Sequence, residues 1–216
     1  MKTTNKILPG HRYVGNFLDA PVRIGMIYRM DDRQFIPALH FNDSYPEIDL
    51  AKWTDSGSKG TLKFTGARDV AISFGTSTST ALGKSEIRLS FRRQKTVAGA
   101  IEDAAIDSLR YGNVLPQLKE IWNTRGYAKF PRDYIFVYEV LSAASGTLVY
   151  SLESKNEVIL RHTLGEPVTK LADLASGNFE YVSNSRRTLE IIRNVAHKPL
   201  FKAFMFRRDW EPEILG

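Results

Sequence analysis

The residues of this chain that most clearly suggest a chemistry are its clustered cations. Lysine and arginine number 30 against 24 aspartate and glutamate residues, which gives a formal net charge of +6. Such clusters attract phosphate groups, whether on nucleic acid or on anionic lipid headgroups, and they also occur as plain solvated surface. Charge alone leaves these alternatives open. The clusters are Lys2, Lys6 and Arg12; Arg92, Arg93 and Lys95; and the run from Arg186 to Arg208.

No residue pattern predicts catalysis, a metal or a cofactor. The four histidines, His11, His40, His162 and His197, are not spaced as metal ligands relative to one another or to a carboxylate. The stretch Ala81–Ser85 ends like a phosphate-binding loop, but the first glycine of that motif is absent and strand-like alternation follows. We therefore predict that the chain is not an enzyme, and an enzymatic site without a known pattern stays an alternative.

Length and composition predict one globular domain over residues 1–216. The chain is 43% hydrophobic and 25% charged, which is ordinary for a folded protein. The absence of cysteine excludes disulfides and suits a reducing compartment. We see no apolar run of transmembrane length and no apolar signal region near the N-terminus, so we expect a cytoplasmic protein.

Alternating polarity predicts a long hairpin over Thr61–Arg93. In its first arm the apolar residues share one parity, and they share one again in Ile87–Phe91. Arg68 interrupts the first arm and indicates a bend near Gly66–Asp69. The polar stretch Gly75–Ser85 connects the arms. The apolar residues of the two arms are Leu62, Phe64, Val70, Ile72, Phe74, Ile87, Leu89 and Phe91.

Three stretches have helical spacing. Apolar residues recur every three or four positions in Lys95–Gly112, and a second stripe lies in Leu115–Gly126, with Pro116 in its first turn. Glu166–Gly177 is a third candidate. We read Asn42–Asp49 as a loop.

The remaining apolar runs are read as strands. Asp133–Leu141 and Gly146–Glu153 flank a short Ser/Ala/Gly stretch and predict a second hairpin. Its first arm is apolar on both faces except for Glu139, which is typical of a central strand. The other predicted strands are Ala20–Met30, Gln34–Phe41, Arg187–Val195 and Pro199–Phe206. The predicted fold class is α+β, with a twisted, mostly antiparallel sheet and two or three packed helices.

The order of these elements resembles the pore-forming domain of the gasdermins over roughly residues 13–210. Three stretches carry the resemblance: Gly60–Phe91 with its Ser/Thr-rich centre, "RGYAKFPRDYIFVYEVLSAASGTLVYSLE" (Arg125–Glu153), and "TLEIIRNVAHKPLFKAFMF" (Thr188–Phe206). The resemblance implies a gasdermin N-terminal-domain-like fold.

It also implies the activity of bacterial gasdermin-like proteins. These are inactive in the cytoplasm until a protease releases them from a short C-terminal segment, here about residues 207–216. The released domain binds acidic inner membrane, forms a homo-oligomer and inserts two β-hairpins per subunit into a β-barrel. The outcome is pyroptosis-like cell death in antiviral defence, with anionic lipid and an activating protease as partners, and no cofactor or nucleic acid.

The resemblance assigns residues to two roles. The basic residues that would bind membrane are Lys2, Lys6, Arg12, Arg92, Arg93 and Lys95. The residues of the inserting hairpins would be Leu62, Phe64, Val70, Ile72, Phe74, Ile87, Leu89, Phe91, Tyr134, Phe136, Tyr138, Leu148, Tyr150 and Leu152.

Two departures from the family and one alternative function remain. The chain lacks the N-terminal cysteine that many bacterial members carry with a lipid. Only "PEILG" follows Arg207–Glu211, so we expect an active fragment, minimal inhibition, or inhibition in trans. The alternative function is a basic nucleic-acid-binding accessory domain, and a half-exposed sheet over a core explains the alternation equally well.

Overall fold

The structure is a computed structural model. It describes residues 7–8, 13–16, 21–31, 34–57, 59–65, 68–77, 84–124, 134–163, 168–184, 187–206 and 212–215.

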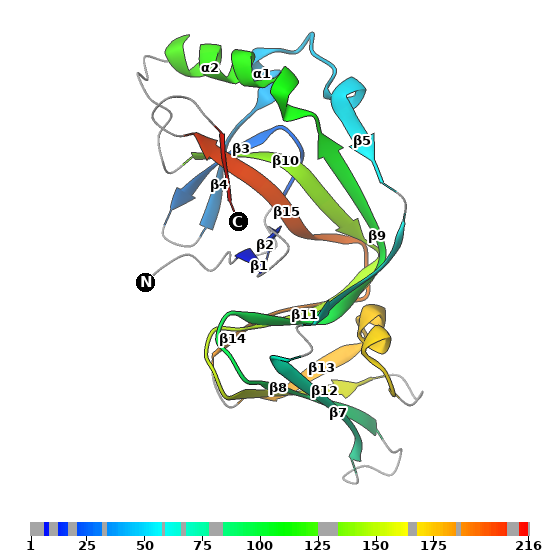
Figure 1. Ribbon diagram of the computed structural model, residues 1–216. Coiled ribbons are helices and arrows are strands. Elements are labelled where there is room, and N and C mark those ends of the chain that lie inside the picture. The colour runs from blue at the N-terminus through cyan, green and yellow to red at the C-terminus, as the bar shows by residue number, and fades with distance from the viewer. Residues whose placement is uncertain are drawn as a thin grey trace. The chain divides into compact units, whose positions relative to one another are not determined.

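The chain forms two compact units, each built mostly of antiparallel strands (Figure 1). Unit 1 comprises Met1–Ser58, Ala105–Ser142 and Lys198–Gly216, and unit 2 comprises Lys59–Ala104 and Ala143–His197. The predicted antiparallel sheet is confirmed, and the helices are short. The single domain over residues 1–216 stays a prediction. Among the described residues, no helix has both the length and the apolar character needed to cross a membrane.

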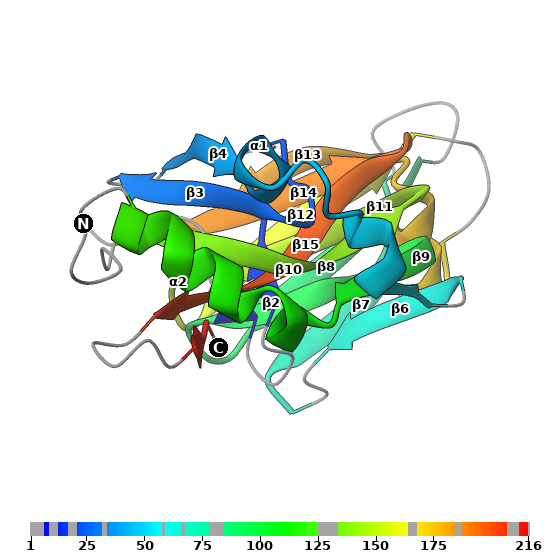
Figure 2. The same ribbon diagram turned by 90° about the horizontal axis from the view of Figure 1, so that it is seen from above.

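Unit 1 is a sheet with its longest helix on one face. β10, Tyr134–Ala143, is its central strand, and only Tyr134 and Ser142 of that strand are partly exposed, so the prediction of a strand covered on both sides is confirmed. Helix α2, Leu115–Thr124, lies across the sheet (Figure 2). Its Trp122 belongs to one buried cluster with Phe136 and Phe204, and its ring lies edge-on to Tyr134 with the centroids 5.6 Å apart. The strands are β1 Ile7–Leu8, β2 Tyr13–Gly15, β3 Met26–Asp31, β4 Gln34–His40, β5 Thr54–Ser56, the end of β9 Thr96–Leu109, β10 Tyr134–Ala143, β15 His197–Phe206 and β16 Pro212–Ile214.

A buried carboxylate joins four strands of unit 1. Glu139 of β10 accepts hydrogen bonds from the Tyr13 hydroxyl at 2.6 Å and from the Ser108 hydroxyl at 3.1 Å. The Lys202 ammonium of β15 lies 2.8 Å from the same carboxylate. Burial raises the pKa of Tyr13, and its bond to Glu139 raises that pKa further. The network fixes β2, β9, β10 and β15 against one another.

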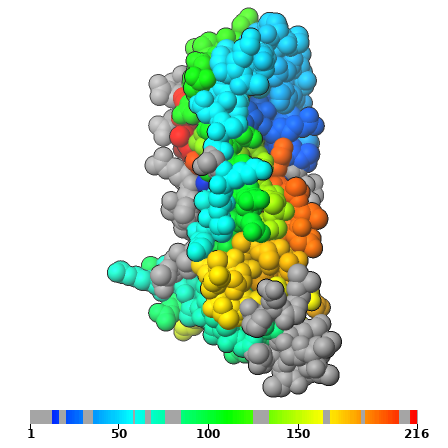
Figure 3. All heavy atoms as spheres, turned by 90° about the vertical axis from the view of Figure 1, so that its right-hand side faces the viewer, coloured from blue at the N-terminus to red at the C-terminus, as the bar shows by residue number. Residues whose placement is uncertain are grey.

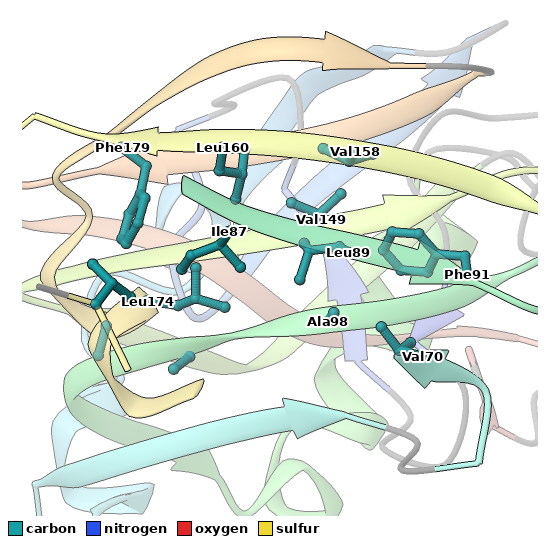
Figure 4. Packing of buried hydrophobic residues seen from close by; sticks show 13 residues of the cluster. Val70, Ile87, Leu89, Phe91, Ala98, Val149, Val158, Leu160, Leu174 and Phe179 are labelled. Carbon is teal, nitrogen blue, oxygen red and sulfur yellow. The ribbon is translucent and has the colours of Figure 1, made fainter. Parts of the chain in front are cut away.

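Unit 2 is a sandwich of two four-stranded sheets. The first sheet has the order β6-β9-β11-β14 and the second has the order β7-β8-β12-β13. Side chains of both sheets meet in one core, in which Ile87, Leu89 and Leu160 face Val149 and Ala98 (Figure 4). The strands are β6 Gly60–Thr65, β7 Val70–Ser77, β8 Lys84–Phe91, the beginning of β9, β11 Ser145–Ser151, β12 Asn156–His162, β13 Phe179–Asn184 and β14 Thr188–Arg193.

The helix predicted over Lys95–Gly112 is wrong, because Thr96–Leu109 is the strand β9. Its first six residues, Thr96–Ile101, are buried on both faces. A strand covered on both faces lacks period-2 alternation, and its alanines and glycine allow an apolar spacing that also fits a helix.

The second predicted hairpin is also wrong in its pairing. β10 and β11 both exist, but the described residues pair β10 with β9, β3 and β15, and pair β11 with β9 and β14. The Ser/Ala/Gly stretch is a bend at Ala144 rather than a hairpin turn. Local residue patterns indicate where a strand lies, whereas its partners depend on contacts with distant segments, so no sequence pattern excluded a hairpin here.

Other predictions are confirmed in part. The helix predicted over Leu115–Gly126 is α2, and the one over Glu166–Gly177 is the shorter 3-10 helix η3, Leu171–Ser176. The predicted Thr61–Arg93 hairpin holds only for β7 and β8, since β6 pairs with β9. The stretch read as a loop begins inside the short helix α1, Phe41–Ser44, and the 3-10 helix η1, Leu50–Trp53, follows it.

Candidate functional site

The four connections between the two sheets of unit 2 all lie at one end of the sandwich. They join β6 to β7, β8 to β9, β11 to β12 and β13 to β14, and the strand registers place their ends at one level. η3 lies at the opposite end, where it forms much of the visible surface of unit 2 in Figure 3 (gold). We call these four connections the corners.

The corners are strongly basic. In their described part, six exposed cations stand against two carboxylates, Asp69 and Glu153. Of these six described cations, only Arg93 forms an ion pair, in which its Nε atom lies 3.2 Å from Asp69 Oδ1. We call the group the basic edge. Its cations are Arg68, Arg92, Arg93, Lys95, Lys155 and Arg187.

The structure thus extends one predicted cluster and leaves another undescribed. Arg92, Arg93 and Lys95 were predicted together, and the fold adds Arg68, Lys155 and Arg187 from distant segments. Arg68 and Lys155 are single cations beside strand ends, so the sequence carried no signal that grouped them with this cluster, whereas Arg187 was predicted as part of a different basic run, Arg186–Arg208. Lys2, Lys6 and Arg12 lie outside the described residues, as do Arg186, Arg207 and Arg208.

Hydrogen bonds between neighbouring corners hold the basic edge. The Lys95 amide donates to the Ser151 carbonyl at 2.8 Å, and the Leu152 amide donates to the Arg187 carbonyl at 3.2 Å. The buried Asn156 amide group donates to the Ser151 hydroxyl at 2.8 Å. Lys95 and Lys155 both have left-handed backbone, with φ of 58° and 53°. Non-glycine residues rarely adopt this conformation, so two of the corners are strained.

The registers show that unit 2 is one four-stranded antiparallel sheet folded over at its corners. Phe91 pairs with Asn156 in one sheet, and Thr96 pairs with Ser151 in the other. From one pair to the other, each segment advances by five residues, from 91 to 96 and from 151 to 156. The pairing of these two central segments is therefore continuous through the corner. The outer segments also keep their neighbours in both sheets. Four segments therefore run side by side in chain order: 60–77, 84–104, 145–162 and 179–193.

Each of these segments carries most of its large apolar residues at one parity on both sides of its corner, and Val149, Ile159, Val182 and Ile192 are the exceptions. In the second sheet this face points into the sandwich core. In the first sheet the side chains that point into the core are instead Ala98, Ala100 and Val149. The large apolar residues of the first sheet therefore point to its other face, and most of them are buried there. Burial raises the pKa of Tyr150 on that face to about 12. The face comprises Leu62, Phe64, Val70, Ile72, Ile87, Leu89, Phe91, Val97, Ile101, Leu148, Tyr150, Val158, Leu160, Phe179, Tyr181, Leu189 and Ile191, with the exposed Phe74 near its edge.

The opposite parity is largely polar. In the second sheet it carries cross-strand ion pairs, from Arg161 to Glu86 at 3.0 Å and from Arg88 to Glu157 at 3.6 Å. In the first sheet it carries Thr147 and Glu190 beside Ala98, Ala100, Val149 and Ile192, which pack in the sandwich core. Burial raises the pKa of Glu190, although a hydrogen bond from Thr188 lowers it in part. Counted along the four segments, one parity is therefore mostly apolar and the other mostly polar.

Most of the residues predicted to insert lie on this one apolar face, and four do not. Tyr134, Phe136 and Tyr138 belong to β10 in the sheet of unit 1, where Phe136 and Tyr138 are core residues. Leu152 lies in a corner rather than in a strand. Sequence reasoning did not include the apolar residues of β9, β12, β13 and β14. Only the strand registers show that these residues lie on the same face as the predicted ones.

Among the described residues, no group of three or more histidine, aspartate or glutamate side chains could hold a metal ion. No family model matches the chain, and no curated protein matches its sequence.

Proposed function

We propose that this protein forms pores in anionic membranes, as the gasdermin resemblance implies, by straightening the folded sheet of unit 2. The observation that carries the proposal is that four segments keep the same neighbours on both sides of their corners, and that the register of the central pair is continuous through the corner. Those segments share one apolar and one mostly polar face, which is the pattern of a transmembrane β-sheet between lipid and an aqueous lumen. No catalytic residue takes part.

Strand length favours straightening over insertion of a hairpin as it stands. A tilted strand needs about 9–11 residues to cross the hydrocarbon core. β7 and β8 have eight residues each, so their hairpin is too short. β6 adds six residues to β7, and the beginning of β9 extends β8 in the same way, so each straightened segment has sufficient length.

A lipid bilayer can cover the apolar face that straightening would otherwise expose to water. Straightening exposes Ile87, Leu89 and Phe91, which now fill the sandwich core, and lipid would cover the same face. Lipid cannot satisfy the free strand edges at 60–77 and 179–193. Adjacent copies would have to pair these edges, so the proposal requires a homo-oligomer.

The basic edge is the proposed membrane contact. A lysine or arginine near an anionic surface contributes about 1 kcal/mol. Six such residues on one edge would hold the corners at the headgroups, where straightening has to begin. Activation by a protease and cell death in antiviral defence belong to the same proposal. The C-terminal β16, which pairs with β15, is the part that cleavage would remove.

Dye release from vesicles tests the proposal. The purified chain, intact and after limited proteolysis, is added to anionic vesicles and to uncharged vesicles. We expect release from the anionic vesicles and rings of protein on them in electron micrographs. A folded chain that releases no dye in either form refutes the proposal.

Charge reversal tests the basic edge separately. Arg68→Glu, Lys155→Glu or Arg187→Glu should weaken vesicle binding more than fivefold, because each change removes about 1 kcal/mol and adds a repulsion. Lys119→Glu on the exposed surface of α2 is the matched control. Equal binding by all four variants contradicts the assignment. Tight, salt-dependent binding of nucleic acid without vesicle binding would favour the nucleic-acid alternative.

A further inference from the structure

Unit 1 contains a pocket of about 510 Å³ that no part of the pore proposal uses. This volume lies within the range of small-molecule sites. β10 and β9 form its floor through Val140 and Asp107, and η1 (cyan at the surface in Figure 3) contributes to its wall. The side chains that could bind a ligand are Arg23, Lys198, Asp49, Asp107, Ser56 and Ser142.

The walls of the pocket are held in place by their own hydrogen bonds. His40 Nε2 lies 2.9 Å from the Ile24 carbonyl oxygen, and His40 Nδ1 accepts from the Asn42 amide at 3.2 Å. Gly25 has φ of 79°, and a Cβ atom there would lie 2.5 Å from a Leu50 methyl group. The glycine therefore lets these segments approach closely. A wall that is already ordered spares a ligand the entropic cost of ordering it.

The polar groups of the pocket carry balanced charge. Asp107 on the floor accepts from the Ser56 hydroxyl at 2.7 Å through Oδ1, which leaves Oδ2 without a partner among the described residues. Asp49 is the second carboxylate. Arg23 has no ion pair in the described part of the chain, and the Lys198 ammonium donates to the Val22 carbonyl at 3.1 Å with further protons available.

We propose that this pocket binds a small zwitterion that carries an ammonium group and a phosphate group. The ammonium would donate to Asp107 on the floor, and Arg23 and Lys198 would bind the phosphate. Two cations and two carboxylates disfavour a ligand with one sign of charge, because half of the pocket repels it. Phosphoethanolamine has this chemistry, either as a free compound or as a lipid headgroup. The proposal does not depend on pore formation.

Titration followed by NMR tests the proposal with three probes: O-phosphoethanolamine, ethanolamine and inorganic phosphate. We expect O-phosphoethanolamine to shift pocket resonances and to bind about tenfold or more tightly than either single-charge probe, since each carries only one of the two contacts. Vesicles with phosphatidylethanolamine or phosphatidylcholine then distinguish the sources. Preference for the first vesicle indicates the headgroup, and equal vesicle binding indicates the free compound.

Variants separate the two contacts. Asp107→Asn should abolish the advantage of O-phosphoethanolamine over phosphate while phosphate binding is kept, and Arg23→Gln should weaken both. Asp55→Asn is the control, because Asp55 pairs with Arg110 at 3.5 Å outside the pocket. No shift of pocket resonances with any probe, equal affinities for the three probes, or unchanged affinities in folded Asp107→Asn overturns the proposal.

Discussion

Lys95 and Lys155 allow a direct test of whether the corners control the straightening of unit 2. Both residues have left-handed backbone in the folded sheet. We compare a double variant with glycine at both positions and one with valine at both positions. Each variant loses the same two charges, so a difference between them reports backbone conformation and not membrane attraction.

The expected magnitude follows from backbone energetics. Left-handed backbone costs a non-glycine residue about 1–2 kcal/mol, and glycine avoids this cost but loses about 0.5–1 kcal/mol in entropy. A β-branched residue is strained further, and it favours an extended strand by up to about 1 kcal/mol. The glycine and valine pairs should therefore differ by about 3 kcal/mol over the two sites, or about 100-fold in the equilibrium between folded and straightened sheet.

Dye release from anionic vesicles measures the difference, with lipid in excess and rates normalised to bound protein. The valine pair should release dye faster than the wild type and the glycine pair more slowly. Urea unfolding without lipid should rank the stabilities in the reverse order. If the stabilities differ as expected and the release rates agree within about threefold, straightening at these corners does not limit pore formation, and the reasoning is refuted.

Three further predictions concern the folded state. Gly99→Ala should destabilise the protein by about 3 kcal/mol in urea unfolding, because a Cβ atom would lie 2.0 Å from the Thr147 carbonyl oxygen, whereas Gly112→Ala, with nothing within 4 Å, should be nearly neutral; equal effects would contradict the packing of β9 against β11. Glu139→Leu should cost about 3 kcal/mol in the same assay because it leaves the Lys202 ammonium unpaired, and adding Lys202→Met should restore most of the loss; additive losses would show that the pair is not coupled. The raised pKa of Glu190 implies stability that is present below its ordinary value of 4.5 and is lost as pH rises through the higher folded value, so the loss should be smaller in Glu190→Gln than in the wild type, and equal losses would show that Glu190 is not responsible.

The sequence predicted those elements whose signal is local. Ile87, Leu89 and Phe91 alternate because one face of β8 is buried, and α2 shows its stripe because one face packs on a sheet. β9 was misread as a helix because burial on both faces removes the alternation. The pocket in unit 1 had no sequence signal, since its charged residues come from segments far apart in the chain.

By itself the sequence determined which residues are apolar, at which parity, and where cations stand beside strand ends. The parity of the apolar residues is the same before and after each corner, because it is counted along the chain and does not depend on how the chain bends. Only the tertiary structure decided which strands pair. It places residues 145–162 beside 84–104, and it gathers six cations on one edge. Pairing depends on contacts between distant segments whose free energies compete across the whole fold, and no local pattern records that competition.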